Sequence, residues 1–343
     1  MDILIFDMDG VLIDVSRSYR ETIQRTVQIY LGTCLGFKKG KAEPVTKEDI
    51  SLFKSAGGFN NDWDLTSGLL LFLLSISGLS RLPKRKKSLS IGEVISHLNT
   101  QSAQFNRNIP KIVRRKNLPP FVEKVKLAGG GLKGVRKVLK SSWEGWVFGD
   151  GDLDQENVVK RIFQEVYLGK KFTSFYHLPP LFHKKQGLYL QERLIIPRKI
   201  LSSLRKRFRL GIASGRPRFE AELALKRFRL LPYFDSLVTL DECQEEETRI
   251  FRTTGKKARY TKPHPYSLLR VVKEIGILNP RCGYVGDVVD DMQAARAAEE
   301  KLDILAIGFL HGGKNDETLK GSLLKAGADL IVESPRALLQ ALT

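Results

Sequence analysis

The sequence predicts an α/β protein built on a parallel sheet, with a long helical segment inserted after the first strand. Residues 3–6 (ILIF) form an apolar run that is too short for a helix and ends at Asp7. From Ile200 onward, short apolar runs alternate with helical patterns, which is typical of βαβ units. Between these two regions the chain leaves the α/β pattern.

The region after the first strand is predicted to be mainly helical. A helix is expected from Ser16 to about Leu31, with Ser16 or Ser18 as its N-cap. A Gly/Asn-rich segment, residues 57–66 (GGFNNDWDLT), precedes a second helix, which we expect to be buried because residues 69–74 are all apolar. Asp154 is the expected N-cap of a third helix, whose apolar residues fall on one face: Val159, Ile162, Phe163 and Val166.

Positive charge is concentrated within this region. The chain of 343 residues has a formal net charge of +19, from 57 Lys and Arg against 38 Asp and Glu. Residues 81–150 contain 16 of the basic residues and 4 of the acidic ones, so they carry most of the excess. We expect a partly flexible insertion with helical pieces. Such a segment could bind nucleic acid or another polyanion, but aromatic residues for base stacking are sparse in it.

The C-terminal part is predicted as a series of strand–helix steps. Strands are expected at 210–213, 236–240, 282–285, 304–307 and 330–332, and helices from about 217 and at 265–275, 290–298, 317–325 and 335–342. The acidic residues at 241–242 and 245–247 are expected in a solvated loop.

Composition excludes several classes of protein. With 42% hydrophobic residues the chain has material for packed cores. Its three cysteines, Cys34, Cys243 and Cys282, show no C-x-x-C pair, which argues against a disulfide framework and a Cys-built zinc site. Acids at positions 2, 7 and 9 argue against a signal peptide, and the longest apolar stretch is shorter than the roughly 20 residues that span a bilayer. We expect a soluble, cytoplasmic protein without a membrane partner.

Polar residues follow three of the predicted strands, where ligands bind in open α/β sheets. They are Asp7, Asp9 and Gly10 after the first strand, Ser214 and Gly215 after the strand at 210–213, and Asp287, Asp290 and Asp291 after the strand at 282–285, with Lys262 between the last two groups. Carboxylates crowded at one edge repel one another unless a cation lies among them, and oxygen ligands favour Mg²⁺. We therefore expect a Mg²⁺ site at this edge.

Four motifs in this order resemble those of the haloacid dehalogenase superfamily of phosphohydrolases. They are DxDGVLID from Asp7, an apolar strand ending in Ser214, Lys262 followed by proline, and GDxxxD from Gly286. The resemblance implies a Rossmann-like sheet with helices on both faces.

The resemblance also implies two domains. Residues 1–14 and 198–343 would form the catalytic core, and residues 15–197 a mainly helical cap inserted as in subfamily I, which includes phosphoglycolate phosphatase-like enzymes. The cap is enlarged by the basic insertion, and segment 57–66 is similar to one branch of that subfamily.

For the reaction, the resemblance implies that Asp7 attacks phosphorus and forms an aspartyl-phosphate. Asp9 would act as general acid toward the leaving alcohol and then as base toward water. An acid at this position favours phosphate chemistry over carbon–halogen cleavage. Mg²⁺ would be held by Asp7, the backbone carbonyl of Asp9, and Asp287.

Further residues would bind the phosphoryl group or support the metal. The expected phosphate ligands are Gly10, Ser214, Gly215 and Lys262, the last also contacting Asp7. Asp291 fits the last acid of GDxxxD and would orient Lys262 or the metal's waters. Its neighbour Asp290 is an open alternative for that role.

The expected function is a Mg²⁺-dependent phosphatase of a small phosphorylated metabolite, with phosphoglycolate and sugar phosphates as candidates. Asn60, Asn61 and Trp63 are candidates for substrate selection by the cap, although a turn with a core tryptophan explains them equally well. A phosphomutase of the same family and a polyanion-binding protein remain as alternatives. The sequence makes no prediction of oligomeric state.

Overall fold

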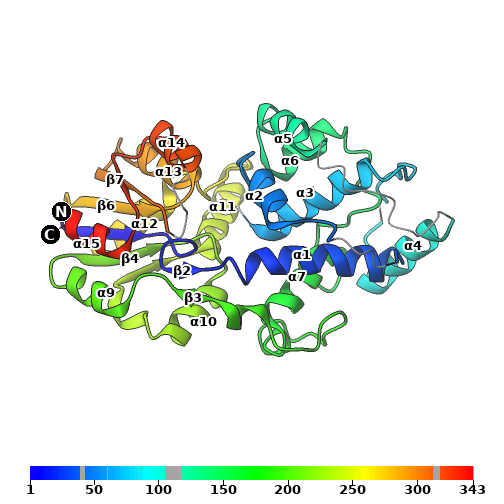
Figure 1. The fold of residues 1–343 in the computed structure, drawn as a ribbon, viewed down its shortest axis with the longest axis horizontal. Coiled ribbons are helices and arrows are strands. Elements are labelled where there is room, and N and C mark those ends of the chain that lie inside the picture. The colour runs from blue at the N-terminus through cyan, green and yellow to red at the C-terminus, as the bar shows by residue number, and fades with distance from the viewer. Residues whose placement is uncertain (39–42, 60, 86, 105–116, 312–316, 343) are drawn as a thin grey trace. The chain divides into compact units, whose positions relative to one another are not determined.

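The computed structural model describes residues 1–38, 43–59, 61–85, 87–104, 117–311 and 317–342. The chain divides into two compact units (Figure 1). The first, Met1–Val15 with Glu192–Thr343, is named the core unit, and the second, Ser16–Gln191, the helical unit.

The core unit contains a six-stranded sheet in the order β5-β4-β1-β6-β7-β8. Its strands are β1 (Ile3–Phe6), β4 (Arg209–Ala213), β5 (Ser236–Val238), β6 (Arg281–Gly286), β7 (Asp303–Phe309) and β8 (Leu330–Val332). Every neighbouring pair is parallel. The prediction of an α/β fold on a parallel sheet is confirmed.

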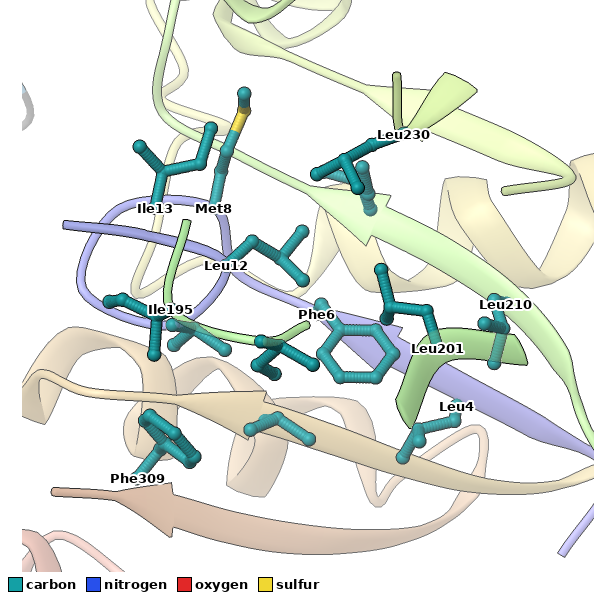
Figure 2. Packing of buried hydrophobic residues seen from close by; sticks show 14 of the residues in the cluster. Leu4, Phe6, Met8, Leu12, Ile13, Ile195, Leu201, Leu210, Leu230 and Phe309 are labelled. Atoms are coloured by element: carbon teal, nitrogen blue, oxygen red, sulfur yellow. The ribbon is translucent and has the colours of Figure 1, made fainter. Parts of the chain in front are cut away.

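Both faces of this sheet are covered, which explains why β1 is apolar at every position instead of alternating. Leu4 and Phe6 pack into one cluster with residues of α9 and α10 (Figure 2), whereas Ile3 and Ile5 pack into the opposite cluster. The helices of this unit are α9 (Arg198–Arg205), α10 (Arg218–Phe228), α11 (Leu240–Thr254), α12 (Tyr266–Ile275), α13 (Val289–Ala298), α14 (Glu317–Lys325) and α15 (Pro335–Leu342).

The predicted acidic loop was wrong, because these residues lie on the helix α11. The helix starts with a capping box in which Thr239 and Glu242 satisfy each other's backbone N–H groups. Leu240 and Cys243 are its buried residues, so the acidic side chains lie on the remaining surface of an amphipathic helix.

Two short antiparallel strands, which the sequence did not predict, lie where the chain leaves the core unit and where it re-enters it. They are β2 (Ile13–Asp14) and β3 (Arg193–Leu194). Strand β2 follows a tight turn in which the amide of Gly10 donates to the carbonyl of Ile13, at 2.8 Å.

The helical unit contains no long strand among its described residues. Its elements are α1 (Tyr19–Ile29), a π-helical turn (Tyr30–Cys34), α2 (Lys47–Lys54), α3 (Asp62–Ser75), α4 (Ile91–Ala103), α5 (Leu118–Leu127), α6 (Gly131–Val138), α7 (Val158–Leu168), α8 (Phe172–Tyr176) and a 3-10 turn (Leu188–Gln191). The predicted helix around 69–74 is α3, which is buried along nearly its whole length. Helix α7 is capped by Asn157, whose side chain accepts from the amide of Lys160, and not by Asp154 as predicted.

The basic segment 81–150 contributes α4, α5 and α6 to this unit. Glycines 129–131 approach glycines 57–58 so closely that a Cβ on Gly131 would lie 2.4 Å from the carbonyl oxygen of Gly58. Only residues without side chains allow this backbone contact. Residues 105–116 and 86 of the segment lie outside the described part of the chain. Among all the residues that the structure describes, no helix is long and apolar enough to cross a membrane.

Candidate active site

The carboxyl edge of the central strands assembles the predicted acids. In the register of the sheet, Phe6 lies opposite Ile212 of β4 and Val285 of β6. The chain positions that follow these residues therefore meet at one edge. Asp7 is the first of them, and its amide still donates to the carbonyl of Val285, at 2.8 Å, so the ladder fixes its backbone.

Lys262 connects this strand end to α13. It lies in the turn before α12, and its ammonium donates to Asp7 Oδ1 at 2.8 Å and to Asp291 Oδ1 at 2.7 Å. It also donates to the hydroxyl of Tyr284, at 2.6 Å, and that hydroxyl donates in turn to Asp291 Oδ1. Tyr284 and Asp291 are fully buried. We name Asp7, Lys262, Tyr284 and Asp291 the lysine cluster.

Asp291 is satisfied on both of its oxygens. While Oδ1 faces Lys262 and Tyr284, Oδ2 accepts from the backbone amides of Asp287 and Val288 at 3.1 and 3.2 Å. Asp290, its neighbour on α13, is half-buried and lies outside the cluster. The geometry therefore places Asp291, rather than Asp290, against Lys262.

The Asp287 carboxylate lies against Gly10. A side chain at position 10 would occupy the space that this carboxylate fills. A Cβ built on Gly10 would meet Asp287 Oδ2 at 2.0 Å, and the φ of Gly10 is +78°. The N–H of Gly10 is engaged in the turn with Ile13. The main requirement at position 10 is thus the space that glycine leaves for the carboxylate.

The carboxylates of Asp7, Asp287 and Asp291 form a donor set for a hard cation. One oxygen from each lies within 4.8 Å of the others. Burial raises the pKa of Asp7 to about 7, and the carboxylates of Asp291 and Asp9 act in the same direction, against the Lys262 ammonium. For Lys262, burial lowers the pKa, but Asp291 and Asp7 outweigh it and hold the pKa well above its usual range. The three carboxylates carry more negative charge than the single Lys262 ammonium can balance. Mg²⁺ would neutralise this excess, and carboxylate oxygens are its preferred ligands.

Asp9 is turned toward a different cation, Arg216. The guanidinium contacts Asp9 Oδ1 through Nε at 2.6 Å and through Nη2 at 2.5 Å. Nη2 also donates to Glu192 Oε1 at 3.0 Å. The Arg216 and Glu192 side chains are 1% and 0% exposed, whereas that of Asp9 is 31% exposed. We name these three residues the arginine cluster.

Ser214 ends β4 at the same edge of the sheet. Its amide donates to the carbonyl of Val238 at 2.9 Å, and its hydroxyl oxygen accepts from the amide of Arg216 at 3.2 Å. Gly215, between the two, is exposed. This turn holds the Ser214 hydroxyl and the Arg216 side chain in fixed positions relative to each other.

The residues predicted to read the substrate belong to the helical unit. Asn61 caps α3 by accepting from the amide of Asp64 at 2.7 Å. The Trp63 ring is buried edge-on against Phe163, with the Lys160 ammonium 4.8 Å from its centroid. Asn60 lies outside the described residues.

Three residues of the site, Tyr284, Arg216 and Glu192, were not predicted from the sequence. Arg216 and Asp9 are 207 positions apart, and no local pattern links them. Tyr284 is a polar residue in a buried strand, and such a residue requires a hydrogen-bond partner. That requirement was the available signal.

Comparison with known proteins gives matches to a protein family and to curated relatives. Residues 187–299 match the family of haloacid dehalogenase-like hydrolases. A phosphoglycolate phosphatase of Xylella fastidiosa (strain 9a5c) is 39% identical over 128 residues, which are 37% of this chain and 46% of that protein. An imidazoleglycerol-phosphate dehydratase of Phytophthora nicotianae is 24% identical over 297 residues, 86% of this chain and 41% of that protein. The chain thus spans about half the length of the curated relatives it matches.

Two solved structures share the fold. A structural genomics target has a TM-score of 0.65 at 21% identity, with 100% of this chain and 99% of that chain covered. The phosphatase Tt82 from Thermococcus thioreducens has a TM-score of 0.53 at 23% identity, with 94% and 99% covered. At these identities the likeness concerns the fold.

Proposed function

We propose that this chain, of which residues 187–299 match the haloacid dehalogenase-like hydrolases, is a phosphatase of a small phosphomonoester and that it works through an aspartyl-phosphate on Asp7. The observation that carries the proposal is the convergence of three carboxylates at the carboxyl edge of the sheet, two of which, Asp7 and Asp291, contact Lys262.

Asp7 is the proposed nucleophile. One of its oxygens attacks phosphorus, the bond from phosphorus to the leaving oxygen breaks, and an acyl phosphate forms on the carboxylate. Lys262 keeps the carboxylate oriented through its 2.8 Å contact with Oδ1 and offers positive charge to the phosphoryl oxygens. Asp291 and Tyr284 hold the Lys262 ammonium in that position.

Asp9 is the proposed acid and base. It gives a proton to the leaving oxygen in the first step, and takes one from the attacking water in the second, when the bond between phosphorus and Asp7 breaks. Ser214, at the neighbouring strand end, is the proposed hydrogen-bond donor to a phosphoryl oxygen, and Gly215 and Gly10 remain proposed phosphate ligands through their backbones.

Asp7, Asp287 and the buried Asp291 are the side chains that would hold or support Mg²⁺. When bound, Mg²⁺ supplies charge neutralisation between the carboxylate nucleophile and the phosphoryl group. Asp9 would contribute its backbone carbonyl, since its side chain faces Arg216.

The helical unit is proposed to act as the cap that selects the substrate, because it is inserted between the proposed nucleophile and the rest of the core unit. Phosphoglycolate is one candidate substrate, suggested by the relative from Xylella fastidiosa. A sugar phosphate is another.

The test measures phosphate release from a panel of phosphomonoesters, with Mg²⁺ and with EDTA. Asp7→Asn, which keeps the shape and removes the nucleophile, is the control. We expect release that requires Mg²⁺ and is lost in the variant. A wild-type protein no more active than Asp7→Asn on every substrate would refute the proposal, and isomerised product without free phosphate would identify a phosphomutase.

A further inference from the structure

The arginine cluster presents Asp9 in a specific way. Both guanidinium contacts, from Nε and Nη2, fall on Oδ1 of the carboxylate. The guanidinium is planar, so two contacts to one oxygen fix the direction of that oxygen more firmly than a single contact would. The other oxygen, Oδ2, is then the one that can carry or accept a proton.

Glu192 holds the guanidinium from its other side. Its side chain is 0% exposed and accepts from Arg216 Nη2 at 3.0 Å, while its backbone carbonyl accepts from Arg227 Nη1 at 3.0 Å. The backbone of Arg216 is fixed as well, because its amide donates to Ser214 Oγ and its carbonyl accepts from the amide of Leu240. Arg216 is therefore held at both ends.

A buried arginine between two acids requires a reason, because the loss of hydration often outweighs the attraction within such a group. Replacing the whole of such a group with apolar side chains of similar volume is often neutral for stability, whereas removing one member is costly. Asp9, the partner of Arg216, is the most exposed of the three side chains and lies two residues after the proposed nucleophile. A role in presenting Asp9 supplies that reason.

We propose that Arg216 is a positioning residue for the acid–base step, and that it presents Oδ2 of Asp9 to the leaving oxygen, with Glu192 fixing the guanidinium. The inference rests on the proposed function and identifies residues of that function that no motif assigned. In the first step it concerns proton transfer to the leaving group, and so it predicts for which substrates kcat/KM depends on Arg216.

Dependence on the leaving group follows from the chemistry. A nitrophenolate leaves without help, whereas an alkoxide needs a proton as the bond to phosphorus breaks, and a well-placed acid contributes about 10²- to 10⁴-fold to such a step. A variant that misplaces Asp9 should have a lower kcat/KM for alkyl phosphates and a nearly unchanged kcat/KM for p-nitrophenyl phosphate, because kcat/KM reports only the first step.

The experiment measures kcat/KM for p-nitrophenyl phosphate and glycerol phosphate in wild type, Arg216→Met, Asp9→Asn and the double variant. For Arg216→Met we expect the ratio of alkyl to nitrophenyl activity to fall by about 10- to 100-fold. Asp9→Asn should lower it at least as far, and the double variant should match Asp9→Asn. Independent, multiplying losses in the double variant would overturn the proposal, as would an equal loss on both substrates in Arg216→Met.

Arg205→Met is the matched control. Arg205 forms a two-bond ion pair with Asp235 in the same unit, at 3.0 Å for both contacts. Its loss should leave the ratio unchanged, and a fall equal to that of Arg216→Met would contradict the assignment.

Two milder variants decide the question should Arg216→Met fail to fold. Arg216→Lys keeps the charge but has no fork, and Glu192→Gln keeps the shape but removes one carboxylate. Both are expected to lower the ratio by less than the Asp9→Asn variant does, and unchanged ratios in both would overturn the proposal. A wild-type protein inactive on both esters would instead mark a failure of the proposed function.

Discussion

The lysine cluster and the arginine cluster each place a cation against a carboxylate of the same DxD motif, but their charge balance differs. Lys262 contacts Asp7 and Asp291, and Asp287 lies close by, so acids outnumber bases by two. Arg216 contacts Asp9 and Glu192. The two acids of one short motif thus lie in different electrostatic environments.

This difference explains how neighbouring carboxylates can take separate roles. The excess of acids, added to burial, raises the pKa of Asp7, which makes its charged form dependent on a further cation. Arg216 instead fixes the orientation of Asp9, because two nitrogens of its guanidinium contact the same carboxylate oxygen.

The largest effect is expected for Asp7→Asn. An amide cannot replace the carboxylate as nucleophile, so kcat should fall by about 10⁴-fold or more for every leaving group. Asp9→Asn should keep a much higher kcat/KM than Asp7→Asn on p-nitrophenyl phosphate, because kcat/KM reports the first step, in which this leaving group needs no acid. Similar losses in both variants on that substrate would break the division of roles.

Asp7→Asn should also make the metal-free protein more stable than wild type, by an amount that depends on pH. In the folded protein the pKa of Asp7 is about 7, against 3.8 as the ordinary value. Between these values the folded state holds one more proton than the unfolded state, so wild-type stability falls as pH rises through this window and is level above it. The upper limit of this loss is about 4 kcal/mol.

Thermal unfolding in EDTA at pH 5 and pH 8 measures this effect. The Tm advantage of Asp7→Asn over wild type should be clearly smaller at pH 5 than at pH 8, and Mg²⁺ should reduce it. Asp290→Asn, from outside the cluster, is the control. An advantage that does not change with pH would contradict the account of Asp7.

Lys262→Met should lower kcat by at least about 10²- to 10³-fold, the cost of removing one preorganised donor to a developing negative charge. The loss should be alike for nitrophenyl and alkyl phosphates, unlike that of Arg216→Met. Lys256→Met, which removes an exposed lysine from the preceding loop, is the control. Selectivity for the leaving group in Lys262→Met would show that the two cations do not act separately.

Asp291→Asn should cost about 2 kcal/mol of stability. Both carboxylate oxygens of Asp291 accept hydrogen bonds, so the NH₂ of an asparagine would face a donor in either orientation of the amide. Oδ1 receives Lys262 and Tyr284, and Oδ2 receives two backbone amides. Denaturant unfolding of this variant and of Asp290→Asn measures the difference. Equal stabilities would show that the buried carboxylate is not needed to hold Lys262.

The smallest effect is expected in the helical unit, which lies outside both clusters. Asn61→Ala removes the cap of α3 and should cost about 1 kcal/mol of stability. The ratio of alkyl to nitrophenyl activity should stay at the wild-type value. A changed ratio without a loss of stability would show that Asn61 acts on the substrate and not on the helix.

The sheet could be predicted because its strands are buried on both faces. Runs such as residues 3–6 are therefore apolar throughout, and their alternation with helical patterns indicates parallel pairing. Helix α11 was missed because its acidic surface outweighed two buried residues, Leu240 and Cys243, although Thr239 and Glu242 spell a capping box. Asp154 was taken for a cap that Asn157 provides, since both are good N-cap residues and only the local backbone distinguishes them.

At the site, the residues that follow strands could be predicted and the residues that join them could not. Asp7, Ser214 and Asp287 lie where parallel strands end, so their meeting follows from topology. The pairing of Arg216 with Asp9 and Glu192 depends on side-chain directions after a turn and on the return of the chain into the core unit, which no local pattern contains.

The central claim is that Asp7 accepts the phosphoryl group. The most direct test is to mix Asp9→Asn with p-nitrophenyl phosphate and Mg²⁺, quench with acid, and map the modified peptide by mass spectrometry. Nitrophenol leaves without an acid, but the second step lacks its base, so phosphate should accumulate on Asp7. Phosphate on another residue, or turnover with no adduct at the earliest times, would contradict the account.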